Sequence, residues 1–287
     1  MTRVFQNVIV IGAGTMGHGI AQVCAMTGRS ATLVDIDPQR LADALAKVGA
    51  NLEKGVARGK VLPETRDRTL GLLGTNTDLA AACADADLVV EAVPENMDLK
   101  ETILRTVDSA APATAVIASN TSSMSITALG AFTSRPERVI GLHFFNPVHI
   151  MALLEIVTGE LTDHEVTSQC RAFAEDIGKT PIVVRDAPGF ATSRLGIAVA
   201  MEAIRMVQEG VASAQDIDTA MELGYRFPMG PLKLTDLVGL DVRLAITEHL
   251  HRELGTDTFR PPQLLKRLVR AGKLGKKSGQ GFYDWES

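Results

Sequence analysis

The sequence predicts an α/β fold, in which a doubly wound parallel sheet is followed by an all-helical C-terminal domain. Short runs rich in Val and Ile, such as residues 7–11 and 115–119, are largely apolar, which is typical of parallel strands buried on both faces. Helical segments separate these runs, and strands that alternate with helices indicate a parallel sheet. After residue 187 the strand pattern stops, so we place the first domain at 1–187 and the second at 188–287.

Each element is predicted from its own pattern and its end signals. The first strand lies within residues 7–14, and the helix after it carries Ile20, Val23 and Cys24 on one stripe and ends at Gly28. The other strands are predicted, in chain order, at 31–35, 87–93, 115–119, 138–145, 153–159 and 180–186. Helices are predicted at 38–55 and 96–111 and, in the second domain, at 191–210, 213–223, 231–254 and 262–272. The helix at 191–210 is apolar on most of its circumference, which is typical of a core or a subunit interface, so we expect a homodimer.

The composition is that of an ordinary globular protein. The 287 residues carry a net charge of −5, which argues against a general nucleic-acid binder. The cysteines Cys24, Cys83 and Cys170 are isolated, show no metal-binding spacing, and are expected to be reduced core residues of a cytoplasmic protein. We expect no membrane span, because no run of about 18 apolar residues occurs.

A glycine-rich stretch joins the first strand to the first helix. Its sequence, Gly12-Ala13-Gly14-Thr15-Met16-Gly17, has the GxGxxG pattern. In chain order, the three glycines allow a tight turn, let the backbone approach a pyrophosphate, and let the helix pack closely on the sheet. The pyrophosphate would lie at the helix N-terminus, where backbone N–H groups point outward. The pattern alone is weak, but its place between a strand and a helix favours a dinucleotide site of the Rossmann type.

An acidic residue at the end of the second predicted strand supports the same site. Asp35 lies 18 residues after Gly17 and is placed to accept hydrogen bonds from the adenosine ribose hydroxyls. A carboxylate there repels the 2′-phosphate of NADP, so NAD is the predicted cofactor. Arg40 is near enough in sequence to leave tolerance of NADP open. The competing interpretation is a glycine turn without a ligand, which the strand, helix and acid together disfavour.

Two ionisable residues interrupt strands that are otherwise apolar. His143 lies in GLHFF and Glu155 in LLEIV, and both are six residues from His149 in the turn between them. If the two strands are antiparallel, the histidine and the glutamate fall opposite each other. A carboxylate would fix the imidazole tautomer and favour its charged form, which suits a general base that accepts a proton from an alcohol. The alternative is a buried pair of purely structural value.

The stretch SNTSS, residues 119–123, follows a predicted strand. It therefore lies at the carboxyl end of the sheet, where open α/β sheets bind ligands. Its hydroxyls and the Asn120 amide are placed to hold a substrate oxygen or the nicotinamide ribose. The alternative is an N-cap cluster for a helix that begins near Met124.

Two basic clusters have open interpretations. The side chains of Asn51, Lys54 and Arg58 share one face of a helix, which is either a phosphate patch or, more simply, a solvated face. Lys276 and Lys277 lie in a glycine-rich C-terminal segment that either contacts a polyanion or packs as a tail.

Seven motifs along the chain carry a family resemblance. They are GAGTMGHGIA, VVEAVPENMDLK, SNTSS, GLHFFNPVHIMALLEIV, DAPGF, DIDTAMELGYRFPMGPLKLTDLVGLD and GKKSGQGFYDW. With these motifs the chain resembles the 3-hydroxyacyl-CoA dehydrogenases from end to end, and most closely the short 3-hydroxybutyryl-CoA dehydrogenase type. The resemblance implies an NAD-binding Rossmann domain, a helical domain that dimerises, an acyl-CoA substrate, and a place in fatty acid or butanoate metabolism.

The resemblance also implies roles for individual residues. The histidine of HFFNP is the catalytic base, which is His143, and the glutamate twelve residues later, Glu155, pairs with it. Ser122, in SNTSS, contacts the substrate oxygen. The cofactor contacts implied or predicted elsewhere in the chain fall on Thr15 and Met16 of the glycine loop and on Glu95, Lys100, Asn120, Asn146 and Lys277.

The chain departs from the family pattern at one position. The family usually reads PGFxxNR, whereas this chain reads PGFATSR and places Ser193 where the asparagine is expected near the catalytic histidine. Serine keeps a donor and an acceptor but has a shorter reach. The predicted activity is NAD-dependent interconversion of (S)-3-hydroxyacyl-CoA and 3-oxoacyl-CoA. The alternatives are a dehydrogenase of a free 3-hydroxy acid or sugar acid, and a cofactor-binding dimer without catalysis.

Overall fold

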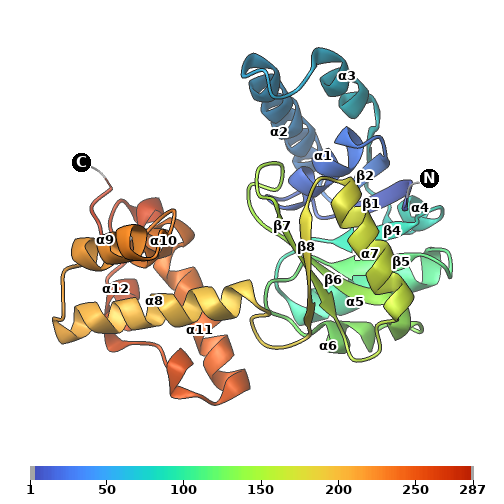
Figure 1. The fold of residues 1–287 in the computed structure, drawn as a ribbon. Coiled ribbons are helices and arrows are strands. Elements are labelled where there is room, and N and C mark those ends of the chain that lie inside the picture. Colours follow the sequence, from blue (N-terminus) through green and yellow to red (C-terminus); the bar gives the residue numbers. More distant parts are fainter. Residues whose placement is uncertain (1–3, 286–287) are drawn as a thin grey trace. The chain divides into compact units, whose positions relative to one another are not determined.

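One eight-stranded sheet organises the N-terminal part of the chain (Figure 1). The computed structural model describes residues 4–285, and the chain divides into two compact units, Met1–Ala187 and Pro188–Ser287. The strand order is β3-β2-β1-β4-β5-β6-β7-β8, and neighbouring strands are parallel except for the antiparallel pair of β6 and β7. The strands are β1 Asn7–Ile11, β2 Ser30–Val34, β3 Leu73–Asn76, β4 Leu88–Glu91, β5 Val116–Ser119, β6 Val139–Phe144, β7 Leu153–Thr158 and β8 Thr180–Arg185. This order confirms the predicted doubly wound α/β class.

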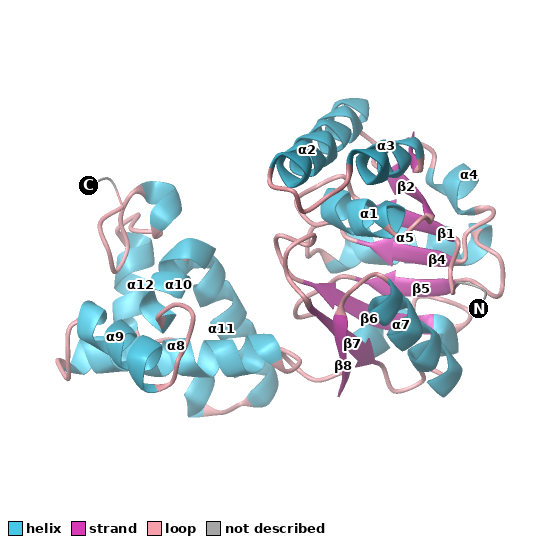
Figure 2. Cartoon of the chain, turned by 45° about the horizontal axis from the view of Figure 1, so that its top comes forward, coloured by secondary structure: helices cyan, strands magenta, loops and turns pink. Residues whose placement is uncertain are grey.

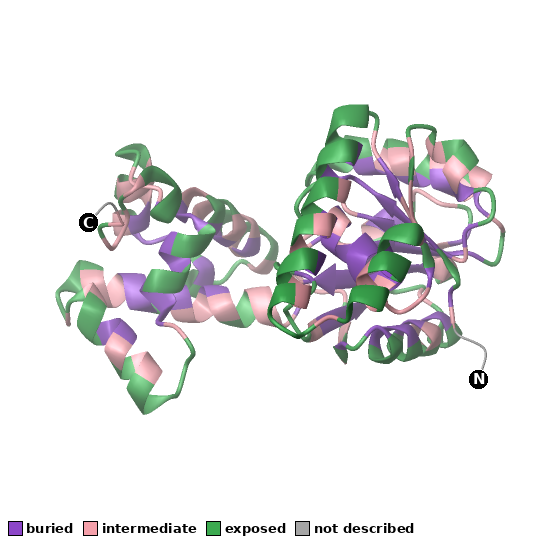
Figure 3. Ribbon diagram, turned by 90° about the horizontal axis from the view of Figure 1, so that it is seen from above, coloured by how far each residue is buried: buried purple, intermediate pink, exposed green. Residues whose placement is uncertain are grey.

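Helices flank this sheet, as Figure 2 shows. They are α1 Gly17–Met26, α2 Pro38–Ala57, α3 Pro63–Gly71, α4 Leu79–Cys83, α5 Met97–Ala110, α6 Ile126–Gly130, α7 His164–Asp176 and the short 3-10 helix η1 Pro136–Arg138. Side-chain caps fix the start of two long helices, because Asp37 accepts from the N–H of Gln39 and Asn96 accepts from the N–H of Leu99. Burial is concentrated in the central strands and the inner helix faces (Figure 3), as the all-apolar strand runs predict.

The structure adds elements that the sequence patterns do not predict. Helix α3, strand β3 and helix α4 occupy residues 63–83, and α7 precedes the last strand. Strand β3 has the sequence LGTN and is only partly buried at the sheet edge, so it lacks the apolar run that identifies the inner strands.

The second unit is helical throughout its regular structure. Its helices are α8 Thr192–Glu209, α9 Ala214–Gly224, α10 Pro231–Val238, α11 Leu240–Leu254 and α12 Gln263–Arg270, with the 3-10 helices η2 Asp257–Phe259 and η3 Lys276–Ser278. The prediction of one helix over 231–254 is wrong, because Gly239 adopts φ +104° and separates α10 from α11. The buried Asp236 ties the C-terminal segment to α10, since its carboxylate accepts from the N–H groups of Phe282 and Tyr283 and from the indole N–H of Trp285.

The three cysteines are free and buried, as predicted. Burial raises the pKa of the Cys24 thiol to about 12 and that of the Cys83 thiol to about 11. Within residues 4–285, every helix is too short or too polar to cross a bilayer.

Candidate active site

The candidate site of the first unit is a cavity of about 370 Å³. It lies where the glycine loop and the segments after β4, β5 and β6 come together, which is the carboxyl end of the sheet. The cavity is lined by Met16, Ala92, Val93, Pro94, Glu95, Lys100, Asn120, Thr121, Ser122, His143, Phe144, Phe145 and Asn146. The structure therefore brings together eight residues predicted or implied at the sequence level, which come from four separate stretches of chain: Met16, Glu95, Lys100, Asn120, Ser122, His143, Asn146 and, behind His143, Glu155.

The glycine loop has the geometry that a dinucleotide cradle needs. Gly12 adopts φ +99°, and its N–H donates to the Val34 carbonyl at 2.7 Å, which fixes the loop against β2. A Cβ on Gly17 would lie 1.8 Å from the Gly12 carbonyl oxygen, so the helix can start here only with glycine. A Cβ on Gly14 would meet no heavy atom within 4 Å, which leaves its outer side open for a ligand. These three positions fit the roles that a pyrophosphate-binding turn assigns to its glycines.

Asp35 lies beside this loop, directly after β2. One carboxylate oxygen accepts from the Ala13 N–H at 2.9 Å, and the other accepts from the Asp37 N–H at 3.1 Å. Each oxygen has a second lone pair, so the carboxylate can also accept from ribose hydroxyls. The residues present therefore fit the adenosine end of NAD.

His143 and Glu155 face each other across the antiparallel strands β6 and β7. They are direct register partners, and His143 Nδ1 lies 2.7 Å from Glu155 Oε2. Both are buried, and the imidazole lies against the Phe145 ring with centroids 4.4 Å apart. A carboxylate is only an acceptor, so Nδ1 carries the proton, and Nε2 is the basic nitrogen of the neutral ring. The predicted register and pairing are confirmed.

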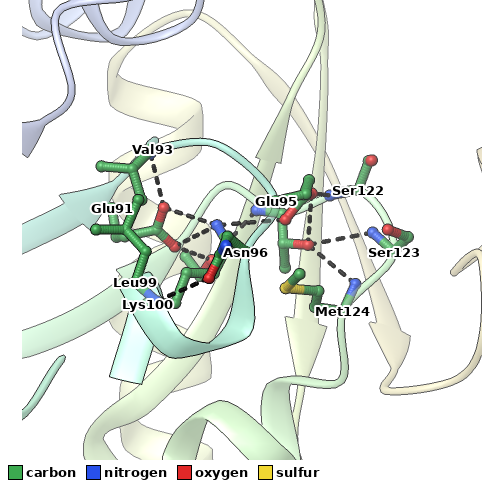
Figure 4. Close-up of polar contacts among 11 residues, drawn as sticks. Glu91, Val93, Glu95, Asn96, Leu99, Lys100, Ser122, Ser123 and Met124 are labelled. Carbon is green, nitrogen blue, oxygen red and sulfur yellow. Dashed lines mark hydrogen bonds and ion pairs between the residues drawn. The ribbon is translucent and has the colours of Figure 1, made fainter. Parts of the chain in front are cut away.

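A buried ion pair connects Lys100, which lines the cavity, to Glu91 at the end of β4 (Figure 4). Lys100 Nζ lies 2.7 and 2.8 Å from the two carboxylate oxygens of Glu91, and it lies 3.3 Å from Glu95 Oε2. The side chains of Glu91 and Lys100 are 0% and 1% exposed, whereas that of Glu95 is 40% exposed. Glu95 Oε1 accepts from the Thr121 hydroxyl at 2.8 Å and from the Ser122 N–H at 3.0 Å. We call this group of Glu91, Glu95, Lys100 and Thr121 the polar wall. It joins the end of β4, the start of α5 and the SNTSS segment.

The SNTSS segment is braced from both sides. The Asn120 N–H donates to the Glu91 carbonyl at 2.8 Å, and Asn120 Oδ1 accepts from the Phe144 N–H at 2.9 Å. Asn120 therefore links β4 to the strand that carries His143. The predicted cap within this stretch is wrong, because α6 begins at Ile126 and its N-cap is Ser125, which accepts from the Ala128 N–H. The Thr121 hydroxyl instead accepts from the N–H groups of Ser123 and Met124 in the turn before the helix. Ser122 and Asn146 both line the cavity. The peptide bond between Asn146 and Pro147 is cis.

Two implied site residues belong to the second unit and are described within it. Ser193 lies in the first turn of α8. Lys277 lies in η3, and its Nζ is 2.6 Å from a carboxylate oxygen of Asp241. This contact lowers the pKa of Asp241.

The two basic clusters make different contacts, each within its own unit. On α2, Asn51 donates to the side-chain oxygen of Gln22 at 3.2 Å, and Lys54 and Arg58 are exposed, which matches a solvated face. In the C-terminal pair, Lys276 lies over the Trp285 ring at 5.3 Å, as a packed tail predicts, and Lys277 pairs with Asp241.

Sequence reasoning assigns no role to Glu91, the deepest member of the polar wall. The signal is present, since an acid within the buried strand LVVE is as unusual as Glu155 in LLEIV.

Taken together, the site offers a dinucleotide cradle, a base oriented by a carboxylate, and hydroxyls beside it. Such a set can transfer a proton to and from an alcohol oxygen while a hydride moves to or from a bound nicotinamide.

Comparisons with known proteins agree with this geometry. Residues 7–187 match the family model described as "3-hydroxyacyl-CoA dehydrogenase, NAD binding domain", and residues 189–285 match "3-hydroxyacyl-CoA dehydrogenase, C-terminal domain". The chain is 42% identical to a probable 3-hydroxybutyryl-CoA dehydrogenase of Bacillus subtilis over 98% of both proteins. It is also 42% identical to a 3-hydroxybutyryl-CoA dehydrogenase of Mycobacterium tuberculosis, over 99% of this chain and all of that one. The crystal structure of (S)-3-hydroxybutyryl-CoA dehydrogenase from Ralstonia eutropha superposes with a TM-score of 0.95 at 40% identity, covering 99% of this chain and 100% of that chain.

Proposed function

The chain belongs to the 3-hydroxyacyl-CoA dehydrogenase family, and from that premise we propose that it uses NAD to interconvert (S)-3-hydroxyacyl-CoA and 3-oxoacyl-CoA with short acyl chains. The observation that carries this proposal is the His143–Glu155 pair at 2.7 Å. The His143 residue lines the same cavity as Met16 of the glycine loop, so the proposed base and the cofactor-binding loop border one cavity.

Residues of the first unit transfer the proton and orient the groups that take part in the transfer. When bound, NAD takes up a hydride in oxidation and supplies it in reduction. His143 accepts the 3-hydroxyl proton at Nε2 during oxidation and returns it during reduction. Glu155 holds the Nδ1–H tautomer and stabilises the imidazolium that forms. The Ser122 hydroxyl positions the C3 oxygen by a hydrogen bond. The family motif alone assigns Ser193 a role toward the substrate.

The cofactor contacts follow from the cradle and the polar wall. Asp35 holds the adenosine ribose, and the loop residues Thr15 and Met16 line the path of the pyrophosphate. At the nicotinamide end we assign contacts to Glu95, Lys100, Asn120 and Asn146, all of which line the cavity. We retain Lys277 as a cofactor contact on the basis of the family motif alone.

The decisive assay follows NADH absorbance with acetoacetyl-CoA as substrate. We expect rapid oxidation that requires the CoA ester and is faster with NADH than with NADPH, because Asp35 repels a 2′-phosphate. Free acetoacetate is the control for the CoA requirement. Activity on the free acid alone would favour the second candidate, a dehydrogenase of free 3-hydroxy acids, for which the serine at position 193 is the supporting observation. NADH binding without turnover of either substrate would favour a non-catalytic dimer.

We also propose that the chain is a homodimer assembled through its second unit. Helix α8 buries Ile197, Met201 and Ile204 in its own unit but leaves Leu195 69% exposed. Leu195 lines an apolar groove with Val199 and other residues of α8 and α10. Burial of such a groove against a second copy would remove apolar area from water.

Light scattering tests the dimer directly. At micromolar concentration we expect twice the chain mass of 30.6 kDa. A charge at the groove should release monomers, so Leu195→Glu is expected to reduce the mass to that of one chain. The matched control is Leu62→Glu, because Leu62 is 61% exposed on the first unit and should leave the mass unchanged. A monomer in the unmodified protein would contradict the proposal.

The three buried thiols support a reducing compartment such as the cytoplasm.

A further inference from the structure

The turn between β6 and β7 carries part of the candidate active site, and we infer that Lys179 is the positioning residue that holds this turn in place. Lys179 keeps residues 146–152 on the helix that follows the glycine loop, and it thereby sets how closely the bound cofactor approaches His143. The inference rests on the proposed function and deepens it, because Lys179 does not line the cavity yet controls the rate of hydride transfer within it.

The Lys179 side chain is buried beside the turn. The residue lies directly before β8 and is 8% exposed. Its Nζ donates to the Val148 carbonyl and, at 2.7 Å, to the Met151 carbonyl. These carbonyls belong to residues three positions apart, so a single ammonium group bridges the turn. Hydrogen bonds from a charged donor are stronger than those between neutral groups, and this contact therefore fixes the backbone of the turn.

The Val148 side chain makes the contact between the turn and helix α1. Val148 is 2% exposed, whereas the other residues of 146–152 are exposed. A Cβ on Gly19 would lie 2.8 Å from the Val148 Cβ and 3.0 Å from one of its methyl groups. The missing side chain of Gly19 thus makes room for Val148 on α1. Because α1 begins at Gly17, the contact lies within the first turn of the helix.

The turn therefore connects the cofactor loop with the proposed base. The first turn of α1, which contains Gly19, directly follows the glycine loop. His143 lies on β6 just before the turn, and Asn146, which we assign to the nicotinamide end, lies within it. Movement of Val148 away from Gly19 would shift Asn146 and the end of β6 relative to a bound cofactor. A displacement of about 1 Å between reacting groups can cost about 100-fold in rate, so the contact matters for hydride transfer.

The test removes the two hydrogen bonds of the ammonium with Lys179→Met, which keeps the length of the side chain. The carbonyls of Val148 and Met151 then lack a donor, so the turn should move outward to where water reaches them. Loss of NADH absorbance is followed in a single turnover, with enzyme in excess over NADH and with saturating acetoacetyl-CoA. We expect the rate to fall about 10- to 100-fold while the amplitude stays unchanged. The Kd of NADH, from fluorescence titration, should stay close to that of the wild type because the glycine loop is untouched.

Two further substitutions separate positioning from a merely structural role. Lys179→Arg keeps a charged donor that can reach main-chain carbonyls, so it should recover most of the single-turnover rate. The matched control is Arg135→Met. Arg135 is also a buried cation that donates to main-chain carbonyls, such as that of Pro112 at 2.7 Å, but it does not line the cavity. Its loss should lower the stability and leave the rate per active molecule unchanged.

The α1 side of the contact supplies an independent variant, which also serves if Lys179→Met does not fold. In Gly19→Ala the new methyl group would displace Val148, so the single-turnover rate should fall although Lys179 is intact. The matched control is Gly49→Ala on α2. A Cβ on Gly49 meets no heavy atom within 4 Å, so this substitution should leave the rate unchanged.

The possible outcomes are distinct. A wild-type rate in Lys179→Met or in Gly19→Ala, with or without a lower amplitude, would overturn the inference. Absence of NADH oxidation by the wild type would instead remove the proposed function, and hydrogen exchange would then test the hold on the turn by itself. The N–H groups of Ile150 and Met151 donate to the Pro147 carbonyl at 2.9 Å. They should exchange faster in Lys179→Met than in the wild type, and equal exchange would show that Lys179 does not hold the turn.

Discussion

Replacing His143 by glutamine is expected to lower kcat for acetoacetyl-CoA reduction by about 10²- to 10⁴-fold, the range that a general acid–base contributes. Glutamine fills a similar space and can keep a hydrogen bond to Glu155, which lies 2.7 Å from Nδ1 in the wild type. It cannot donate or accept a proton at the substrate oxygen in the catalytic pH range. The affinity for NADH, measured by fluorescence titration, should remain close to that of the wild type because the glycine loop is untouched.

The control for this substitution is His164→Gln. His164 is exposed at the start of α7 and does not line the cavity, so its replacement should leave kcat unchanged. Near-normal turnover in His143→Gln would remove the proposed mechanism, since no other imidazole in residues 4–285 lines this cavity.

The second large effect is expected from the glycine loop, where two single methyl groups should behave differently. In Gly17→Ala the new Cβ would lie 1.8 Å from the Gly12 carbonyl oxygen, a backbone atom that cannot rotate away. We expect a loss of about 3 kcal/mol or more in the free energy of unfolding, as overpacking at a fixed backbone implies, together with loss of NADH binding. Denaturant unfolding with a fluorescence titration of NADH measures both quantities.

Gly14→Ala is the matched substitution two residues after Gly12. Its Cβ meets no heavy atom within 4 Å, so the free energy of unfolding should change by about 0.5 kcal/mol or less. NADH affinity should nevertheless fall, because the methyl group occupies the side from which a pyrophosphate approaches. If Gly14→Ala bound NADH as tightly as the wild type, the loop would not be the pyrophosphate cradle.

The catalytic hairpin can be predicted from the sequence because two signals agree there. His143 and Glu155 are both out of place in apolar strands, and the turn between them fixes which residues face each other. The glycine loop is predictable for a similar reason, since its strand, its helix and Asp35 all lie within one continuous stretch.

Glu91 shows where such reasoning ends. Like Glu155, it is an acidic residue in an otherwise apolar strand. Its partner Lys100, however, lies on a helix, α5, and not on a neighbouring strand. No register rule links a strand end to the first turn of the following helix, so the contact depends on the path of the loop between them. The edge strand β3 is hard to predict because pairing with β2 forms it, and the break at Gly239 is hard to predict because a single glycine also occurs inside helices.

The antiparallel pairing of β6 with β7 also has a consequence for inheritance. The proton-transferring histidine and its carboxylate lie within one continuous segment, 139–158, that forms its own hairpin. The connection between the two strands is short, so bringing them together costs little chain entropy. A recombination breakpoint outside this segment transmits both residues or neither. The dyad can therefore pass between related genes as a single cassette, while the glycine loop and the helical unit diverge around it.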